Sequence, residues 1–383
     1  MFTLWVVMVH LSRSLKILFL STSVGPLGSG LGGGVELTLK NVARALMDRG
    51  HHITVVAPAG SQLDDVPLVE ITGALQPTAQ HAGREAGIAM PGNAVLAEMW
   101  NYARIMQSQY DLMVNFAYDW LPFYLTPFFT CPIAHLVSMG SLTDVMDQAI
   151  ALVAQQFPHA IAVHSKAQAK TFVGGNQFQV VGNGFDIARY HFNPAPDNVL
   201  GWLGRLAPEK GLEDAVLVAQ KTGIPLKIWG AMPDVAYWQA IRDQYPDAPI
   251  QYEGFVSTET IQQTLGQCRA LLMTPRWVEA FGNVAIEALA CGVPVIAYQR
   301  GGPAEIVQSG ITGWLVPPDR PDALIAAIAK LDQIDRQTCR QWVETHYSLE
   351  AMGDRMEQWF AAILAEPSAA IAAANTATPP RMA

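Results

Sequence analysis

Two cations stand close together in one loop of an acidic chain. Arg205 and Lys210 lie in the run GRLAPEKG, which begins at Gly204 directly after the apolar run 199–203. The 383-residue chain has 24 Lys and Arg against 33 Asp and Glu. A forked guanidinium and a mobile ammonium suit a diphosphate that gains charge as a bond breaks. A solvated surface loop would hold the same residues, and the loop by itself leaves both interpretations open.

Two glutamates with seven residues between them surround a predicted helix start. Glu279 and Glu287 lie on either side of Phe281, Gly282 and Asn283, and the run VAIEAL that follows has helical composition. Asn283 could cap this helix or present its amide to a ligand. The helix N-terminus can hold an anion, and the two carboxylates can accept hydrogen bonds from different sugar hydroxyls. A solvated Glu287 is the alternative, but its apolar neighbours favour a buried acid that needs partners.

A glycine-rich loop follows the first apolar run. Gly28, Gly30 and Gly33 satisfy G-x-G-x-x-G, a pattern of dinucleotide sites. The glycines come several residues after the strand, and the second strand ends without the acidic residue that grips a ribose. We therefore disfavour NAD binding. Either the glycines only ease a turn, or Gly32 and Gly33 let backbone N–H groups approach a ligand; we favour the second interpretation.

Composition excludes several classes of protein. The net charge of -9 disfavours a nucleic-acid partner or an anionic membrane. Half the chain is hydrophobic and 15% is charged, which excludes overall disorder. The four cysteines form no C-x-x-C pair, so we expect neither disulfides nor zinc but a reduced, cytoplasmic protein. The apolar segment 1–14 is too short to span a bilayer and is interpreted as a leader, without stable membrane insertion.

Strand-like runs alternate with helical patterns along the chain, which predicts the α/β class with parallel sheets covered on both faces. The helix after the glycine loop shows apolar residues at i, i+4, i+7 and i+8 from Val35, and Gly50 ends it. The predicted strands are 15–20, 52–57, 112–116, 133–137, 161–163, 199–203, 226–229, 270–273 and 295–298. We expect two doubly wound, Rossmann-like domains facing each other across a cleft. Their predicted bounds are 15–192 and 199–345, with a linker 193–198, a helix 346–365 and a disordered tail 366–383.

These motifs together resemble the retaining GT-B glycosyltransferases of family 4. The spaced glutamates are followed by ACGVPV and GGPAE, the glycine loop matches the family's first loop, and NGFD at 183–186 resembles a family turn. The resemblance covers nearly the whole chain. Within the family, the runs 24–44 and 116–148 are similar to cyanobacterial enzymes that transfer glucose from UDP-glucose to tetrahydrobiopterin.

The resemblance implies a site. Its catalytic residues would be Arg205, Lys210 and Glu279, and its donor-binding residues Gly32, Gly33, Gly204, Phe281, Gly282, Asn283 and Glu287, the last on the nucleotide ribose. It also implies front-face displacement with retention, in which the leaving phosphate takes the acceptor's proton. We expect no metal and no cofactor beyond the UDP-sugar, because the cations and a helix terminus can stabilise the diphosphate.

The acceptor is expected on the first domain, beyond two predicted strands. The residues proposed for it are Tyr118, Asp119, Trp120, Ser138 and Asp147. Carboxylates can accept the N–H groups of a pterin edge, and an aromatic face can stack on its ring. Tyr118 and Trp120 could equally be core residues. Many family members have a histidine where Ser138 stands, which puts that histidine's role in doubt here, and His135 is expected in the core.

Two other functions share this build. A nucleotide-sugar epimerase would have the same two domains, and a two-lobed sugar-binding protein would lack catalysis. The second would not need Arg205, Lys210 and Glu287 together. UDP release that depends on an acceptor distinguishes the three.

Overall fold

The computed structural model describes residues 13–78 and 83–366, which fold into two units. Unit 1 comprises Met1–Gly184 and Leu349–Ala383, and unit 2 comprises Phe185–Ser348. The predicted tail from 367 and nearly all of the predicted leader lie outside the described residues. In the described ranges, no helix combines the length and the apolarity that a bilayer crossing requires.

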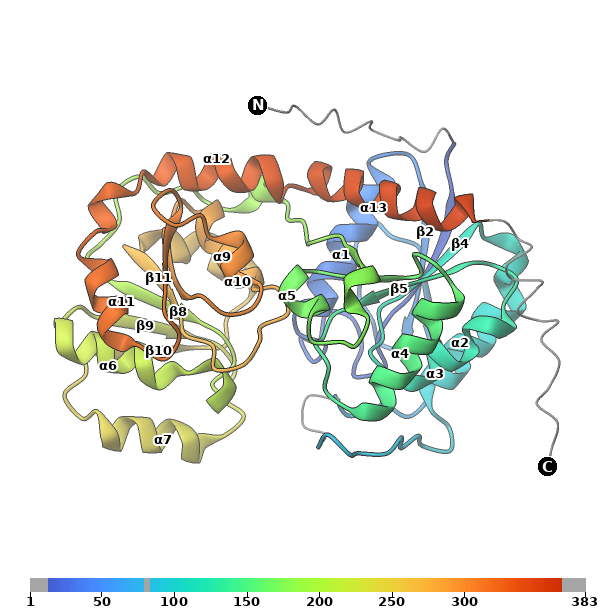
Figure 1. The fold of residues 1–383 in the computed structure, drawn as a ribbon, viewed down its shortest axis with the longest axis horizontal. Coiled ribbons are helices and arrows are strands. Elements are labelled where there is room, and N and C mark those ends of the chain that lie inside the picture. Colours follow the sequence, from blue (N-terminus) through green and yellow to red (C-terminus); the bar gives the residue numbers. More distant parts are fainter. Residues whose placement is uncertain (1–12, 79–82, 367–383) are drawn as a thin grey trace. The chain divides into compact units, whose positions relative to one another are not determined.

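Unit 1 is built on a seven-stranded parallel sheet of order β3-β2-β1-β4-β5-β6-β7 (Figure 1). Its strands are β1 (Lys16–Leu20), β2 (His52–Pro58), β3 (Leu68–Ile71), β4 (Leu112–Asn115), β5 (Ile133–Val137), β6 (Ile161–Val163) and β7 (Gln179–Val180). All five strands predicted for this part of the chain are confirmed. The order begins 3-2-1-4-5-6, which is the order of a doubly wound Rossmann fold.

Helices cover both faces of this sheet. Successive side chains of a strand point to opposite faces, so one strand contributes to two cores. Ile17 and Phe19 of β1 pack in one core with α1 (Gly34–Met47) and α13 (Leu349–Ala365). Leu18 packs on the other side with α2 (Val95–Met106). The unit also contains α3 (Trp120–Leu125), α4 (Asp144–Gln156) and α5 (Lys166–Ala169). The continuous apolar runs of the sequence are thus strands buried on both faces.

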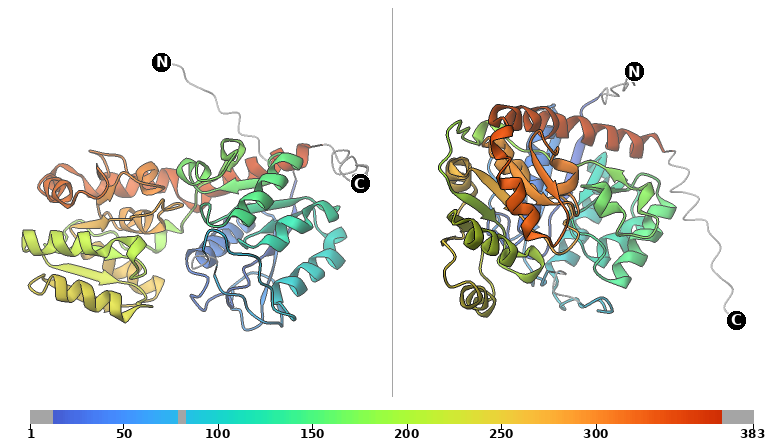
Figure 2. Two further views of the ribbon diagram at one scale, coloured as in Figure 1. Left: turned by 60° about the horizontal axis from the view of Figure 1, so that its bottom comes forward. Right: turned by 60° about the vertical axis from the view of Figure 1, so that its left-hand side comes forward.

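The C-terminal helix α13 belongs to unit 1, beside α1 (Figures 1 and 2). Arg49, just after α1, donates hydrogen bonds to Asp354 at 2.7 Å and to Glu357 at 2.9 Å. His51 Nε2 lies 3.0 Å from the other oxygen of Glu357. The chain therefore returns to its first domain after completing the second, and the helix predicted over 346–365 begins at Leu349.

Unit 2 has a six-stranded parallel sheet of order β10-β9-β8-β11-β12-β13, again 3-2-1-4-5-6 in chain order. Its strands are β8 (Leu200–Leu203), β9 (Leu226–Trp229), β10 (Ile250–Gly254), β11 (Ala270–Met273), β12 (Val295–Tyr298) and β13 (Gly313–Val316). Its helices are α6 (Leu212–Thr222), α7 (Val235–Gln244), α8 (Thr258–Thr264), α9 (Asn283–Ala290), α10 (Pro303–Ile306), α11 (Pro321–Ile328) and α12 (Arg336–His346). The predicted α/β class with two Rossmann-like parallel-sheet domains is confirmed.

The boundary between the units differs from the predicted linker 193–198. Phe185 N donates to Tyr347 O at 2.8 Å, so the chain joins unit 2 at residue 185, fourteen residues before the expected start at 199. Asn193, in the proline-rich stretch, accepts a hydrogen bond from Arg336 Nε at 2.6 Å and is part of unit 2. The prolines mark an irregular segment fixed on the surface of a domain, which composition does not distinguish from a linker.

Candidate functional site

Two loops meet at the carboxyl edge of the unit 2 sheet, where β8 and β11 end. Arg276 N, after β11, donates to Glu209 O, after β8, at 2.9 Å. Gly211 has φ +65°, and a Cβ there would lie 2.1 Å from Thr274 O. Only glycine lets the two loops approach this closely. Their contact aligns the segment that carries Lys210 with the segment that carries Glu279.

Lys210 and Glu279 form an ion pair in a half-buried position, with side chains 23% and 17% exposed. Trp277 Nε1 donates to the same carboxylate oxygen, Glu279 Oε2, at 3.1 Å. The Lys210 ammonium also lies 5.0 Å from the centre of the Trp277 ring. Arg205, four residues before Glu209 in the same loop, is paired with that glutamate. The structure thus brings Lys210 and Glu279 together, and it adds Trp277, to which we assigned no role from the sequence.

Two glycines hold the backbone of the Glu279 segment. Gly302 N donates to Glu279 O at 2.7 Å, and a Cβ on Gly302 would lie 2.1 Å from Phe281 O. Gly282 has φ +101° and is itself the N-cap of α9. Asn283 is therefore the first residue of the helix and does not cap it. The N-cap alternative is wrong because the chain reverses at Gly282, where a left-handed conformation favours glycine over asparagine.

Glu287 is buried in α9, with only 8% of its surface exposed. Tyr190 donates its hydroxyl to Glu287 Oε1 at 3.3 Å. Burial raises the pKa of Glu287 to about 7, and the Tyr190 hydrogen bond opposes this shift. Sequence reasoning expected a buried acid with a partner but missed Tyr190, because 97 residues separate the two in the chain. The expected ribose contact remains a prediction.

The glycine-rich loop of unit 1 surrounds a carboxylate of its own helix. Glu36 Oε2 accepts hydrogen bonds from Gly28 N at 2.8 Å and Gly30 N at 3.3 Å, and Oε1 accepts from Gly32 N at 2.7 Å. Gly33 has φ +58° and starts α1. The loop thus forms a backbone concavity that suits an anion. We expected the backbone N–H groups of this loop to meet a ligand. In the structure, Glu36 accepts hydrogen bonds from three of them.

The residues expected to bind the acceptor follow β4. Asp119 caps α3 by accepting from Leu121 N at 3.1 Å, and it accepts from Gln76 Nε2 at 3.1 Å. Burial raises the pKa of Asp119. Tyr118 accepts from Leu142 N at 3.2 Å, and burial raises its pKa to about 12. Trp120 stacks on Tyr124 with ring centres 4.4 Å apart. Tyr118 and Trp120 also pack partly on the core around α4, as the alternative interpretation proposed.

The other two expected acceptor residues follow β5. Ser138 Oγ is buried and has no hydrogen-bond partner among the described residues. Asp147 Oδ2 accepts from Ser141 Oγ at 2.7 Å and from Arg84 at 2.5 Å. His135, inside β5, is fully buried between Asn115 and Thr126, and burial lowers its pKa to about 3. His135 is therefore the neutral core residue that we expected.

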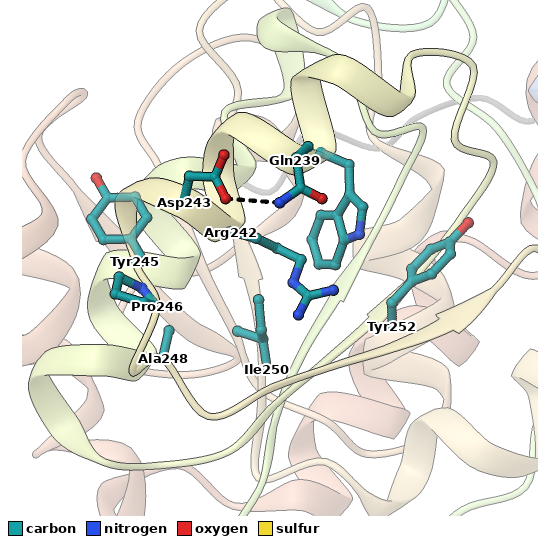
Figure 3. A pocket seen from close by; sticks show the side chains of 9 residues that line it. Gln239, Arg242, Asp243, Tyr245, Pro246, Ala248, Ile250 and Tyr252 are labelled. Carbon is teal, nitrogen blue, oxygen red and sulfur yellow. Dashed lines mark hydrogen bonds between the residues drawn. The ribbon is translucent and has the colours of Figure 1, made fainter.

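A separate groove of about 710 Å³ lies at the edge strand of unit 2, between α7 and β10 (Figure 3). Trp238, Arg242 and Tyr252 are among its lining residues. It contains none of the residues predicted for the site. Within residues 13–78 and 83–366, no group of three or more His, Cys, Asp or Glu side chains is arranged to hold a metal ion.

One part of the chain is similar to a known family. Residues 186–348 match the family model "Glycosyl transferases group 1". The 2-deoxystreptamine N-acetyl-D-glucosaminyltransferase of Streptomyces fradiae is 31% identical over 142 residues, which are 35% of this chain and 34% of that protein. Sucrose synthase 4 of Oryza sativa subsp. japonica is 41% identical over 70 residues, 18% of this chain and 9% of that protein. The chain thus aligns with about a third or less of these curated relatives.

Solved structures match over both units. HepE of Anabaena in complex with UDP-glucose has a TM-score of 0.71 and 20% identity, and the match covers 91% of this chain and 99% of that chain. The sucrose-phosphate synthase of Thermosynechococcus elongatus has a TM-score of 0.72 and 18% identity, with 91% and 98% covered. These likenesses show the fold. Residues 186–348 are therefore similar to the group 1 glycosyl transferases, in a chain whose two units have the GT-B fold.

Proposed function

We propose that this protein is a retaining glycosyltransferase that moves a hexosyl group from a UDP-sugar to a small hydroxylated acceptor. The observation that carries the proposal is the ion pair between Lys210, in the loop that also holds Arg205, and Glu279, beside the ring of Trp277 in the loop after β11. These groups lie at the carboxyl ends of β8 and β11, where doubly wound sheets bind ligands. The segment belongs to the domain that matches group 1 glycosyl transferases.

Arg205 and Lys210 would bind the donor's diphosphate. The bond from the sugar C1 to the phosphate oxygen breaks, and a bond from the acceptor oxygen to C1 forms on the same face. The acceptor's proton goes to the departing phosphate. Negative charge grows on the diphosphate during this step, so two preorganised cations lower the barrier. Both cations are paired with glutamates, so binding of the diphosphate would exchange one partner for another instead of burying a bare charge.

Donor binding would then free an oxygen of Glu279. When the diphosphate attracts Lys210, Glu279 Oε2 loses its cation and can accept a hydroxyl of the transferred sugar, while Trp277 keeps the carboxylate oriented. Glu287 would accept the ribose hydroxyls in the same way that it accepts the hydroxyl of Tyr190. The donor contacts expected at Gly32 and Gly33 stay predictions.

The finer proposal is that the sugar is glucose and the acceptor is tetrahydrobiopterin. HepE, a structural neighbour, was solved with UDP-glucose. The acceptor residues Asp119 and Asp147 offer carboxylate oxygens, and Trp120 offers a ring, as a pterin with N–H groups along a flat edge requires. The same loops follow β4 and β5 at the ligand-binding edge of the sheet. We place the reaction in the cytoplasm without a metal ion; the free thiols of the four cysteines support a reduced environment.

The decisive experiment incubates the protein with UDP-glucose and tetrahydrobiopterin and measures UDP release and the product mass. The proposal predicts UDP release only with acceptor, and a glucoside whose anomeric configuration by NMR equals that of the donor. An epimerase would instead change the sugar without acceptor, and a binding protein would release no UDP.

Lys210→Met provides the variant for this experiment. It should lose most of the transfer activity, because the departing diphosphate loses a cation. Lys227→Met is the matched control, since Lys227 lies on β9 of the same sheet and contacts Gln267 at 3.2 Å. Equal loss in both variants would contradict a specific role of Lys210.

A further inference from the structure

Arg242, on the exposed side of α7, has neither an ion pair nor a hydrogen bond to any residue that the structure describes. Every other arginine in the described ranges has at least one such partner. The adjacent acid, Asp243, accepts a hydrogen bond from Gln239 Nε2 at 2.7 Å and is not paired with Arg242. In a chain of net charge -9, Arg242 is thus a cation that no side chain of the described protein neutralises.

Arg242 lines the groove between α7 and β10, whose volume is about 710 Å³. Figure 3 shows its side chain extending from the helix toward the strand. Sites for small molecules have volumes of about 300–1,000 Å³, so the groove has room for a ligand of two sugar rings. The unpaired guanidinium therefore lies on a concave surface that a ligand can enter from solvent.

The helical period of α7 gathers the polar groups of the groove beside an aromatic ring. Trp238 and Arg242 are four residues apart, and so are Gln239 and Asp243; all four line the groove. Side chains at this spacing are neighbours on the surface of a helix. The groove therefore presents an indole, a guanidinium, an amide and a carboxylate within one turn of helix.

The core of unit 2 holds the aromatic walls of the groove in place. Trp238, Tyr245 and Tyr252 pack against that core as partly buried side chains. The ring centres of Trp238 and Tyr252 are 5.6 Å apart, and Tyr252 donates its hydroxyl to Gly230 O at 2.8 Å. A ligand meets surfaces that are already ordered, which lowers the entropic cost of binding.

These groups select the chemistry of a ligand. A guanidinium binds a carboxylate through two parallel hydrogen bonds. Gln239 Oε1 and Asp243 Oδ2 take no part in the hydrogen bond between these two side chains, and both can accept from hydroxyl groups. The face of an aromatic ring can cover the apolar C–H face of a pyranose. Asp243 repels a ligand with several negative charges, so a single carboxylate among hydroxyl groups fits best.

We propose that this groove is a second binding site of unit 2, whose ligand is a saccharide with one carboxylate, as in a glucuronosyl unit. Arg242 binds the carboxylate, Trp238 covers the sugar ring, and Gln239 and Asp243 accept its hydroxyls. The inference goes beyond the proposed transfer reaction, because the groove shares no residue with the donor or acceptor sites. It gives the protein a means of holding an acidic saccharide apart from the residues assigned to transfer.

The test measures, by calorimetry, how the full-length protein binds cellobiouronic acid and cellobiose. These disaccharides differ only in the carboxylate that replaces one primary alcohol. The acid should bind about 10-fold more tightly or better, because only the acid forms a charge-assisted pair with Arg242. Excess UDP should leave this binding unchanged. Equal affinity for the two disaccharides, or competition by UDP, would overturn the inference.

Two arginine variants locate the binding. Arg242→Gln should weaken the binding of cellobiouronic acid about 10-fold and leave that of cellobiose unchanged. Its melting temperature should stay the same, because Arg242 has no partner to lose among the described residues. Arg320→Gln is the matched control, since Arg320 is an exposed arginine of the same unit that pairs with Asp322. An Arg242→Gln protein that binds the acid normally, or equal losses in both variants, would contradict the site.

Further measurements test the aromatic wall and the class of ligand. Trp238→Ala should weaken the binding of both disaccharides, and Trp238→Phe should retain part of it, because a smaller ring still covers a pyranose. A tetraglutamate peptide carries carboxylates without sugar rings and should bind at least about 10-fold more weakly than cellobiouronic acid. A peptide that binds equally well would overturn the saccharide as the ligand. Binding that depends on Arg242, in a protein that releases no UDP with any acceptor, would support this site and refute the proposed function.

Discussion

The two units share the strand order 3-2-1-4-5-6 but differ in how the polar groups at the carboxyl edges of their sheets are paired. In unit 2 the charged groups at the edge are paired: Arg205 with Glu209, and Lys210 with Glu279. In unit 1 the edge holds buried oxygens that have no hydrogen-bond partner within the described part of the chain, at Ser138, Thr143 and Asp147 among others. A ligand at the paired edge would have to exchange partners with these ion pairs, whereas a partner for the unpaired oxygens would add hydrogen bonds.

This difference agrees with the proposal that unit 2 binds the nucleotide sugar and unit 1 binds the acceptor. The matched family segment, 186–348, coincides with unit 2. Under the proposed function, its paired cations would bind the diphosphate of the nucleotide sugar. Under the same proposal, the acceptor would bind at the edge of the unit 1 sheet. Substitutions in unit 2 should therefore act mainly on rate and nucleotide binding, and substitutions in unit 1 mainly on the acceptor.

Arg205→Ala should give the largest effect on turnover among the changes proposed here. The loss of one donor to a developing anion costs about 10²–10³ in kcat. Stability should change little, because Arg205 and Glu209 are a partly exposed pair. Turnover and melting temperature are measured together, with Arg320→Ala as the control, since Arg320 pairs with Asp322 on the surface. A near-wild-type kcat would remove Arg205 from the site.

Glu287→Gln should weaken nucleotide binding itself. A hydrogen bond to a charged group contributes about 1.5–3 kcal/mol, so the dissociation constant for UDP should rise about 10-fold or more. Calorimetry with UDP measures this, and biopterin binding in unit 1 should be unchanged. Unchanged UDP affinity would leave Glu287 as a structural partner of Tyr190.

The buried Glu287 also predicts a pH dependence of stability. Its folded pKa of about 7 lies above the ordinary glutamate value of 4.5, so the folded state binds more protons between these values. Stability should therefore be highest below the unfolded pKa and fall as pH rises from about 4.5 to about 7. Between pH 5 and 8 the free energy of unfolding should fall by about 2 kcal/mol, since a tenfold change in proton affinity corresponds to about 1.4 kcal/mol. Urea unfolding should show this fall in the wild type and not in Glu287→Gln; parallel curves would argue against it.

Removal of metal ions should have the smallest effect. If Arg205 and Lys210 neutralise the diphosphate, transfer should persist in excess EDTA at close to its original rate. The assay measures UDP release before and after chelation, and after addition of magnesium. Activity that is lost with EDTA and restored by magnesium would show that the paired edge of unit 2 is incomplete without a cation.

The sequence by itself determined nine of the thirteen strands in the described residues, the class of fold and the loops that carry the chemistry; β3, β7, β10 and β13 were not predicted. Apolar runs and helical periods are local patterns, and parallel strands place the ends of neighbouring runs at one edge. The family resemblance assigned Lys210 and Glu279 to one site although 69 residues separate them, and the parallel-strand rule agrees with that assignment.

Only the tertiary structure decided which groups meet there and in what state. Tyr190 reaches Glu287, Glu36 fills the glycine loop, and α13 returns to unit 1 through Arg49. The prolines at 193–198 lie within unit 2 and do not separate the domains. These contacts join residues by close packing of side chains, which has no period along the chain and so leaves no local pattern to read.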